Sequence, residues 1–383
     1  MQRSCLPVAF LVLGVAISTS CGGGSSSTVP PPAAACTPAS PPAIAYVLND
    51  SQPSTVSMYT VNSCTGSLSP TSPATVLIPD NAFGSEQMAV DPSGRFAYVA
   101  NLISNASDEA TISMYTINPT TRILTPTTPP TVPTGFFPQG IAIDPLGRFV
   151  YTANTDDNTI SMFTINPGTG VLTPTSPPSV ATGSSPDAVR VDPTGKFAYA
   201  ANQDDGTISM YTIDASNGVL RPLAGVAPAG GSPFDITIDT SGKFAYVPNA
   251  YSGNNAVTQY TIDSTTGALT PNSPSFVSAG NGPTSVAVDP ASQFAYVVNR
   301  QDNTISMFLI DPATGNLTPN SPATIAAGGQ PWRIVVDPSG KFAYVGNQNE
   351  GTVSIYSINK NGTLTAAGTA TAGSDPVSLA VTK

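Results

Sequence analysis

The sequence predicts an all-β fold, a seven-bladed β-propeller with four strands in each blade. Three observations support this prediction: a short phrase that recurs seven times, a period near fifty residues between its copies, and two chain ends that complement one another. One repeat of this length cannot bury its own apolar faces, so the repeats must pack side by side in a closed ring. The expected propeller domain is residues 44–383.

The recurring phrase reads Phe-Ala-Tyr-Val-Ala-Asn at Phe96–Asn101, and a degenerate first copy lies at Ile44–Asn49. Successive copies of its tyrosine are 47 to 53 residues apart. Short alternating apolar runs at this period are typical of propeller blades. The seven tyrosines are Tyr46, Tyr98, Tyr151, Tyr199, Tyr246, Tyr296 and Tyr344.

Residues 186–226 illustrate how one repeat divides into strands. Runs that alternate apolar and polar residues are separated by turns such as Asp192-Pro193-Thr194-Gly195, in which Asp, Pro and Gly occupy their favoured positions. No segment of residues 44–383 has a helical period with caps. Four strands in each of seven repeats predict about 28 strands in total. The four strands of this repeat begin at Val189, Phe197, Thr207 and Val219.

The two ends of the domain complement each other. The last residues, Pro376–Val381, resemble the first strand of a repeat, as in Pro186–Val191, but no second strand follows them. The first phrase, Ile44–Asn49, has no first strand before it. We therefore expect the C-terminal strand to complete the N-terminal blade, which closes the ring and leaves no open sheet edge.

The first 21 residues have the composition of a targeting segment. Arg3 precedes an apolar run, Leu6–Ile17, that is too short to span a bilayer comfortably, and small residues then lead to Cys21. The pattern resembles a bacterial lipoprotein signal, which implies that Cys21 is lipidated, although Ser18 stands where such signals usually carry leucine. Ordinary secretion with cleavage nearby is the alternative. Residues 22–43 predict a Gly/Ser/Pro-rich tether.

Both alternatives predict an exported bacterial protein. A lipoprotein signal implies a lipid anchor in the cell envelope, at the outer membrane or periplasm, whereas ordinary secretion implies a secreted protein. Cys36 and Cys64 are the cysteines of the remaining chain, and export permits a disulfide between them. Both lie on the same face of the expected ring, so the bridge would fasten the tether to the propeller near its closure.

Charge excludes one class of function. The net charge is −10, charged residues make up only 9% of the chain, and there is no histidine. An acidic protein is a poor match for nucleic acid or anionic lipid, so we expect membrane contact only through the N-terminal lipid. The sequence predicts a monomer whose partner is a small molecule, a glycan or another protein.

Acidic residues concentrate on one face, the top, which holds the loops that enter first strands and the turns between second and third strands. Propellers usually bind ligands on this face. The excess predicts a cation such as Ca²⁺ or a basic partner there, although no loop has the spaced Asp pattern of a calcium loop, and turn formation is the alternative. These acids are Asp50, Asp80, Glu86, Asp108, Glu109, Asp156, Asp157, Asp187, Asp204, Asp205, Asp235, Asp302, Glu350 and Asp375.

The channel mouth gives a more specific signal. The second and fourth residues after each entering proline share one side of the inner strand, and most of them are small. Arg190, Asp235 and Arg333 break that pattern, and a charged side chain there is costly unless it is paired. They form either a structural ion pair or a site for a carboxylate or phosphate.

Four further residues are candidate ligand contacts at the mouth: Gln87, Phe234, Arg300 and Trp332. Trp332 and Phe234 are suited to stack on a sugar or an aromatic ligand, although ordinary packing is the alternative for both. The Met-Tyr and Met-Phe pairs of the third strands, such as Met114-Tyr115, are interpreted as packing residues.

The phrase Tyr-Val-Ala/Thr-Asn, the preceding Asp-Pro-Ser-Gly-Lys/Arg-Phe turn and the strand Asp-Asn-Thr-Ile-Ser together resemble the YVTN-type propellers. These belong with the lactonase-like seven-bladed propellers, which include 6-phosphogluconolactonase and the carboxymuconate cyclising enzyme. The resemblance covers all seven repeats. It implies the fold, and it implies a site of histidine, arginine and glutamate at the inner-strand mouths.

The absence of histidine removes the commonest general base near neutral pH. Under the resemblance, Arg190 and Arg333 would bind a substrate carboxylate or phosphate, and Asp235 or Glu86 would serve as base. Two hypotheses result. The first is a binding or scaffold module that uses its acidic top face. The alternative is a lactonase-type hydrolase acting on a sugar or carboxylate lactone, for which export argues against a cytoplasmic phosphorylated substrate.

Overall fold

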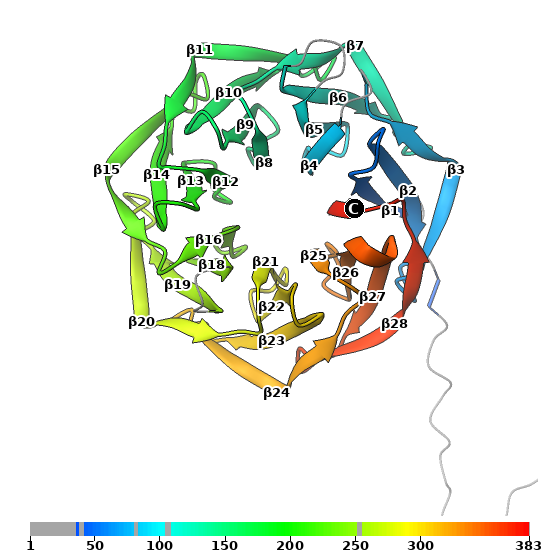
Figure 1. The fold of residues 1–383 in the computed structure, drawn as a ribbon, viewed down its shortest axis with the longest axis vertical. Coiled ribbons are helices and arrows are strands. Elements are labelled where there is room, and N and C mark those ends of the chain that lie inside the picture. Colours follow the sequence, from blue (N-terminus) through cyan, green and yellow to red (C-terminus); the bar gives the residue numbers. More distant parts are fainter. Residues whose placement is uncertain (1–35, 38–41, 80–82, 104–108, 251–254, 383) are drawn as a thin grey trace, which may run out of the picture. The chain divides into compact units, whose positions relative to one another are not determined.

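The structure is a computed structural model of the 383-residue chain and describes residues 36–37, 42–79, 83–103, 109–250 and 255–382. All of its sheets belong to the unit Pro38–Lys383. In that unit seven antiparallel sheets form a ring, with one strand of each sheet at the centre and one at the rim (Figure 1). The predicted seven-bladed propeller is therefore confirmed.

The blades are numbered in chain order, and the strands of each run from the centre to the rim. Blade 1 has β29 (Pro376–Val381), β1 (Ala43–Asn49), β2 (Thr55–Val61) and β3 (Leu68–Leu77). Blade 2 has β4 (Phe83–Val90), β5 (Phe96–Ile103), β6 (Thr111–Ile117) and β7 (Leu124–Pro133). Blade 3 has β8 (Pro138–Ile143), β9 (Phe149–Asn154), β10 (Thr159–Ile165) and β11 (Leu172–Ala181). Blade 4 has β12 (Pro186–Val191), β13 (Phe197–Asn202), β14 (Thr207–Ile213) and β15 (Leu220–Pro228).

Blade 5 has β16 (Ser232–Pro233) and β17 (Thr237–Ile238), then β18 (Phe244–Ala250), β19 (Ala256–Ile262) and β20 (Leu269–Ser278). Blade 6 has β21 (Pro283–Val288), β22 (Phe294–Asn299), β23 (Thr304–Ile310) and β24 (Leu317–Ala326). Blade 7 has β25 (Pro331–Val336), β26 (Phe342–Asn347), β27 (Thr352–Ile358) and β28 (Leu364–Thr371), with a short 3₁₀ turn at Gln348–Glu350.

The ring closes as predicted. The last strand, β29, pairs antiparallel with β1, and Tyr46 of the first phrase lies opposite Ala380. Blade 1 is thus assembled from both ends of the domain, so every inner strand has a partner and the sheet edge is protected. The N-terminal targeting segment and most of the tether lie outside the described residues, and their boundaries stay predictions.

One inner strand is interrupted. In blade 5 the pairing with β18 breaks between Pro233 and Thr237, which gives two short strands where the other blades have one. Asp235 lies in the gap, and its Oδ1 accepts a hydrogen bond from the Ile236 N–H at 2.9 Å. That N–H is therefore satisfied locally rather than by the ladder. The divided strand explains why the described part of the chain has one strand more than seven four-stranded blades require.

The repeated tyrosine connects each blade to the next. Its ring is fully buried, and in six of the blades its hydroxyl donates to the carbonyl of a turn glycine in the following blade, as from Tyr98 to Gly170 at 2.8 Å. Tyr46 donates instead to the carbonyl of Arg122 at 2.6 Å, whose φ of 60 is also positive. Gly170 has φ +75, and a Cβ there would lie 2.3 Å from the ring of Phe96, so a larger residue does not fit beside that ring. Each such hydrogen bond contributes about 1 kcal/mol, so the phrase stabilises the ring as well as the blade.

The methionines of the third strands are packing residues, as predicted. Met114 and Met162 are fully buried, and each sulfur accepts a backbone N–H from the neighbouring blade, from Leu172 and Leu220 at 3.2 Å. Both Cys36 and Cys64 are disulfide-bonded. Within the described ranges, no helix has the length and apolarity needed to cross a membrane.

Candidate functional site at the channel mouth

The three charged residues singled out in the inner strands meet in one ion network. Asp235 Oδ1 lies 2.7 Å from Nη2 of Arg190, and its Oδ2 lies 3.0 Å from Nη1 of Arg333. The Asp235 side chain is only 3% exposed, whereas Arg190 is 23% exposed and Arg333 10% exposed. Asp235 thus bridges two guanidinium groups from blades 4 and 7, and the trio carries a net charge of +1.

The interrupted strand of blade 5 positions this bridge. Arg190 projects from the paired part of β12, opposite Tyr199, whereas Arg333 lies where the register of β25 shifts between Pro331 and Ile334. Both replace the small residues of most other blades. Asp235 reaches both because it lies in the gap between β16 and β17. Buried charges persist only when they are paired and hydrogen-bonded, and Asp235 supplies an oxygen to each arginine.

Gln87 extends the network to blades 2 and 3. Its Oε1 accepts the Ile141 N–H of β8 at 2.9 Å and lies 3.4 Å from Nη1 of Arg190. On the other side, the Nε of Arg333 is buried and has no acceptor within the described part of the chain. The guanidinium of Arg333 therefore retains donor capacity beyond its ion pair, which a ligand oxygen or a water would satisfy.

Two carboxyl groups at the mouth titrate near neutrality. Burial raises the pKa of Glu86 to about 7, with a further increase from Asp50 and Asp375 and a decrease from Arg333. Burial likewise raises the pKa of Asp187 to about 7, where Arg333 lowers it and Glu86 raises it. Arg333 is thus within electrostatic range of both carboxyls. Two groups that exchange protons near pH 7 are suited to acid–base chemistry, for which proteins most often use histidine.

Asp50 and Asp375 belong to the same acidic neighbourhood. Burial raises the pKa of both carboxyls above their usual range. Asp50 also accepts the backbone N–H of Ser85 at 3.1 Å, which ties blade 1 to β4 at the residue before Glu86. The mouth therefore combines one fixed cationic network with several carboxyls whose ionisation is suppressed by burial.

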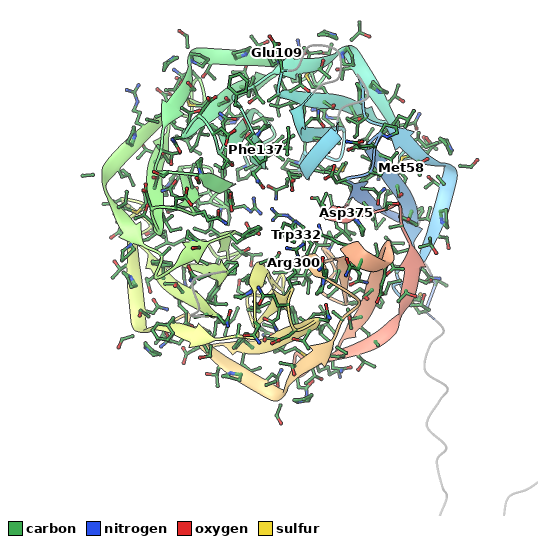
Figure 2. The ribbon with its side chains drawn as sticks, viewed as in Figure 1. Met58, Glu109, Phe137, Arg300, Trp332 and Asp375 are labelled. Atoms are coloured by element: carbon green, nitrogen blue, oxygen red, sulfur yellow. The ribbon has the colours of Figure 1, made fainter. Side chains whose placement is uncertain are left out.

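An aromatic cluster borders the network. The ring of Phe234 packs edge-on against Trp332 with centroids 5.1 Å apart, and the Arg300 guanidinium lies over Trp332 at 4.5 Å. Arg300 Nη2 also donates to Gln348 at 3.0 Å. Figure 2 shows Arg300, Trp332 and Asp375 together beside the central channel. The four contact candidates therefore lie around the mouth, and the packing predicted as an alternative for Phe234 and Trp332 is also present.

Most of the other top-face acids have a visible structural contact. In several blades, the acid in the turn between the second and third strands accepts a backbone N–H from the loop that enters the same blade. Asp157 accepts the Phe136 N–H, and Asp302 accepts the Asn281 N–H. Glu350 accepts the Gly329 N–H in the same way. Asp80 and Asp108 lie outside the described residues. In the described ranges, no group of three or more Cys, Asp or Glu residues is arranged to hold a metal ion.

Sequence reasoning did not single out Asp187 as a site residue. Asp187 was named only as one of the top-face acids. Its distinguishing feature is burial, which depends on the tertiary structure. One signal was available: Asp187 directly follows the entering proline of the same strand that carries Arg190. Glu86, by contrast, was a candidate base in the sequence analysis, and its carboxyl is within electrostatic range of Arg333.

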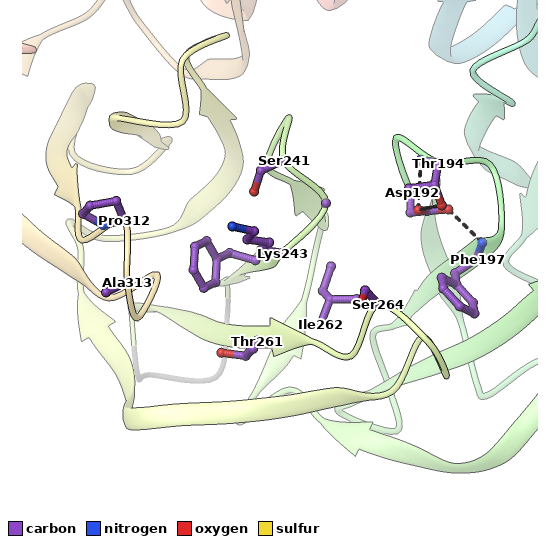
Figure 3. A pocket seen from close by; sticks show the side chains of 12 residues that line it. Asp192, Thr194, Phe197, Ser241, Lys243, Thr261, Ile262, Ser264, Pro312 and Ala313 are labelled. Atoms are coloured by element: carbon purple, nitrogen blue, oxygen red, sulfur yellow. Dashed lines mark hydrogen bonds between the residues drawn. The ribbon is translucent and has the colours of Figure 1, made fainter.

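A separate pocket of about 510 Å³ lies on the bottom face, away from the channel mouth (Figure 3). In blades 2 and 3 an arginine bridges the corresponding groove: Arg95 Nη1 donates to the Pro167 carbonyl and Arg148 Nη1 to the Ala215 carbonyl, both at 3.0 Å. Lys243 holds that position in blade 5, and the counterpart carbonyl belongs to Pro312, which lines the pocket. The pocket therefore lies where blade 5 carries a lysine in place of the bridging arginine of blades 2 and 3.

Lys243→Arg is therefore expected to close this groove, because the guanidinium would donate to the Pro312 carbonyl as Arg148 does to Ala215. One such hydrogen bond should raise the free energy of unfolding by about 0.5–1 kcal/mol. Thermal denaturation of the variant measures the gain. Lys360→Arg, at an exposed turn, is the matched control and should leave the melting temperature unchanged; an equal gain in both variants would contradict the bridge.

Fold and site together define a seven-bladed propeller with an ion network and near-neutral carboxyls at its channel mouth. The family model "Lactonase, 7-bladed beta-propeller" matches residues 39–183, 173–279 and 271–381, and the chain belongs to this family. No curated protein matches the chain significantly.

Solved structures share the fold. A protein from Bacteroides uniformis ATCC 8492, described as a provisional 6-phosphogluconolactonase, is 21% identical with a TM-score of 0.75, over 88% of this chain and 99% of that one. A similarly described protein from Bacteroides fragilis NCTC 9343 is 20% identical with a TM-score of 0.73, over 89% and 98%. The periplasmic gluconolactonase of Pseudomonas aeruginosa is 17% identical with a TM-score of 0.71, over 89% and 99%. At these identities the likeness concerns the fold alone.

Proposed function

We propose that this protein hydrolyses a sugar lactone at the channel mouth. The observation that carries the proposal is the placement of Glu86 and Asp187, both with a pKa of about 7, within electrostatic range of Arg333. A base that is half ionised near neutral pH and a fixed guanidinium are the two groups that hydrolysis of an activated ester requires. Membership of the lactonase family supports the same reaction class.

Glu86 acts as the general base, because the residue is partly exposed to solvent, whereas Asp187 is buried. Water attacks the lactone carbonyl carbon, Glu86 takes the proton of that water, and the carbonyl oxygen becomes an oxyanion stabilised by Arg333. The ring C–O bond then breaks, and the ring oxygen takes the proton back from Glu86. The product is a hydroxy acid, and Glu86 is again ionised.

In this scheme Asp235 is not the general base, although the sequence analysis considered it for that role. Both of its oxygens are engaged by guanidinium groups, so it orients Arg190 and Arg333 rather than abstracting a proton. Arg190 reinforces Asp235, and burial lowers the pKa of its guanidinium while Asp235 opposes that change. Arginine nevertheless remains charged at any physiological pH.

The substrate is an uncharged lactone rather than a phosphorylated one. The net charge of −10 and the acidic top face repel a phosphate dianion, whereas a neutral sugar lactone enters without that penalty. Export, as predicted from Met1–Cys21, would also separate the protein from cytoplasmic sugar phosphates. Among the structural neighbours, one is named a periplasmic gluconolactonase.

The decisive experiment measures acid release from glucono-δ-lactone and from 6-phosphogluconolactone at pH 7, with and without the purified protein. We expect turnover of the neutral lactone well above the solvent rate, and a loss of at least tenfold in Arg333→Met. Arg221→Met is the matched control, since Arg221 is exposed on β15 and its ion-pair partner is Asp214. Binding of lactone without turnover would instead favour the binding or scaffold module.

Anchoring is a separate part of the proposal. Lipidation of Cys21 predicts that the protein fractionates with membranes and incorporates labelled palmitate in a bacterial host. Cys21→Ala should abolish both. Soluble release of the unaltered protein would favour ordinary secretion.

A further inference from the structure

Two phenylalanines next to the mouth are unusually exposed. Phe136 is 60% exposed and Phe137 is 37% exposed, and they are the only sequence neighbours among the exposed large apolar side chains that the structure describes. They lie in the loop between β7 and β8, which enters blade 3 on the top face. Exposed aromatic pairs that do not pack into a core commonly serve a binding function.

The backbone of this loop is strained at Phe137. Its φ is +57, a left-handed conformation that bulky residues rarely adopt. The repeat requires that conformation, because the residue before the entering proline has positive φ in four other blades as well. There the residues are smaller or polar: Ser185, Gly282, Gln330 and Asp375. A phenylalanine at this position costs stability, which points to a role other than folding.

Hydrogen bonds fix the loop next to the carboxyl pair. The Phe137 carbonyl accepts the Thr155 N–H at 2.9 Å, and the Thr155 hydroxyl donates to the Pro186 carbonyl at 3.0 Å. Pro186 directly precedes Asp187, one of the two carboxyls with a pKa of about 7. Figure 2 shows Phe137 at the inner edge of the ring, in the blade next to the one that carries Asp187.

Polar groups surround the aromatic pair. Asp157 accepts the Phe136 N–H at 2.8 Å, and both Asp156 and Asp157 are exposed. Asp157 thus holds the loop while its carboxylate stays open to solvent beside Phe136. Aromatic faces beside exposed carboxylates suit a sugar ring, whose C–H face stacks on the aromatics while its hydroxyls donate to the acids.

We propose that Phe136 and Phe137 form a subsite for a second sugar ring, so that the preferred substrate is the lactone of a disaccharide. The inference rests on the proposed function, since the reacting lactone ring would occupy the mouth beside Asp187 while the second ring stacks on the phenylalanines. A single aromatic pair is too small for a stable protein interface, which buries well over 1,000 Å² in total.

The test compares cellobiono-1,5-lactone with glucono-δ-lactone in the full-length protein. We expect kcat/KM to favour the disaccharide lactone about tenfold, the ratio that one good stacking contact provides. Phe136→Ala should reduce that ratio to near one. Leu146→Ala is the matched control, because Leu146 is 71% exposed in a bottom-face turn of the same blade and should leave the ratio unchanged.

Phe137→Gly separates binding from folding. Glycine accepts positive φ without strain, so the variant should melt about 2 °C higher while it loses the preference for the second ring. A structural role for Phe137 would instead lower the melting temperature.

Binding is read independently of turnover through Trp332, the only tryptophan, which lies at the mouth. Titration of its fluorescence with cellobionate and with gluconate should show tighter binding of cellobionate, and Phe136→Ala should remove the difference. If lactones are not hydrolysed but this difference remains, the catalytic proposal fails and the subsite stands. Equal affinity for the two acids, or an unchanged ratio in Phe136→Ala, overturns the subsite.

Discussion

Replacement of Asp235 by alanine is expected to lower the free energy of unfolding by about 3–5 kcal/mol. The substitution removes the carboxylate that bridges Arg190 and Arg333 and leaves two largely buried guanidinium groups facing one another without a counter-ion. Uncompensated buried charge is among the few causes of such large single-residue effects. Denaturant titration of the purified variant, with the native protein alongside, measures the loss.

Two further variants identify the cause. Asp235→Asn keeps an oxygen acceptor but loses the charge. Its free energy of unfolding should therefore lie between those of the native protein and Asp235→Ala. The triple variant Arg190→Met, Asp235→Leu, Arg333→Met replaces the whole network by apolar groups and should be more stable than Asp235→Ala alone, because it leaves no charge unpaired. If Asp235→Ala costs less than about 1 kcal/mol, water in the channel solvates both arginines and the network is not a structural element.

The fold could be predicted almost entirely from the sequence, because each repeat carries its own strand and turn signals. Tyr98 and its counterparts set the period, and the incomplete ends at Ile44–Asn49 and Pro376–Val381 indicated the closure. The break between β16 and β17 was not predicted, although Pro248 of β18 lies opposite it and has no backbone N–H to donate to the ladder. The contacts of Asp235 in the gap could not be foreseen, because its two arginine partners are 45 and 98 residues away in the chain.

The site was predictable only in part. Arg190, Asp235 and Arg333 were visible because they replace small residues in a repeat, but their mutual pairing was one of two alternatives. The near-neutral titration of Glu86 and Asp187 was not visible at all, since desolvation is a property of the assembled mouth rather than of any repeat. Phe137 was missed for a related reason: the left-handed backbone at its position became known only from the three-dimensional structure.

Glu86→Gln is expected to reduce kcat/KM for a neutral sugar lactone at least a hundredfold, because the amide cannot take a proton from the attacking water. In the native protein, kcat/KM should fall tenfold per pH unit below about pH 7 and be constant above it, since the base must be ionised. Initial rates between pH 5 and pH 8, corrected for spontaneous hydrolysis, give this profile. Glu109→Gln, the same change at an exposed top-face position, is the control and should preserve both rate and profile.

Asp187→Asn distinguishes the two carboxyls. If Glu86 is the base, this variant retains most of the activity, and its profile still has an acid limb. Any residual activity of Glu86→Gln that depends on Asp187 should have its midpoint at lower pH, because the charge of Glu86 contributes to the raised pKa of Asp187. A hundredfold loss in Asp187→Asn with normal activity in Glu86→Gln would reverse the assignment.

Stability provides a check on the titration that needs no substrate. The folded state holds the Glu86 proton up to about pH 7, whereas the unfolded chain releases it near the ordinary value of 4.5. The contribution of this proton to stability is therefore fully present below pH 4.5 and is lost as pH rises toward 7, by up to about 3 kcal/mol. The melting temperature of the native protein relative to Glu86→Gln should accordingly decline between pH 5 and pH 8. A constant difference across that range would mean that Glu86 ionises normally, and the base would then have to be sought elsewhere at the mouth.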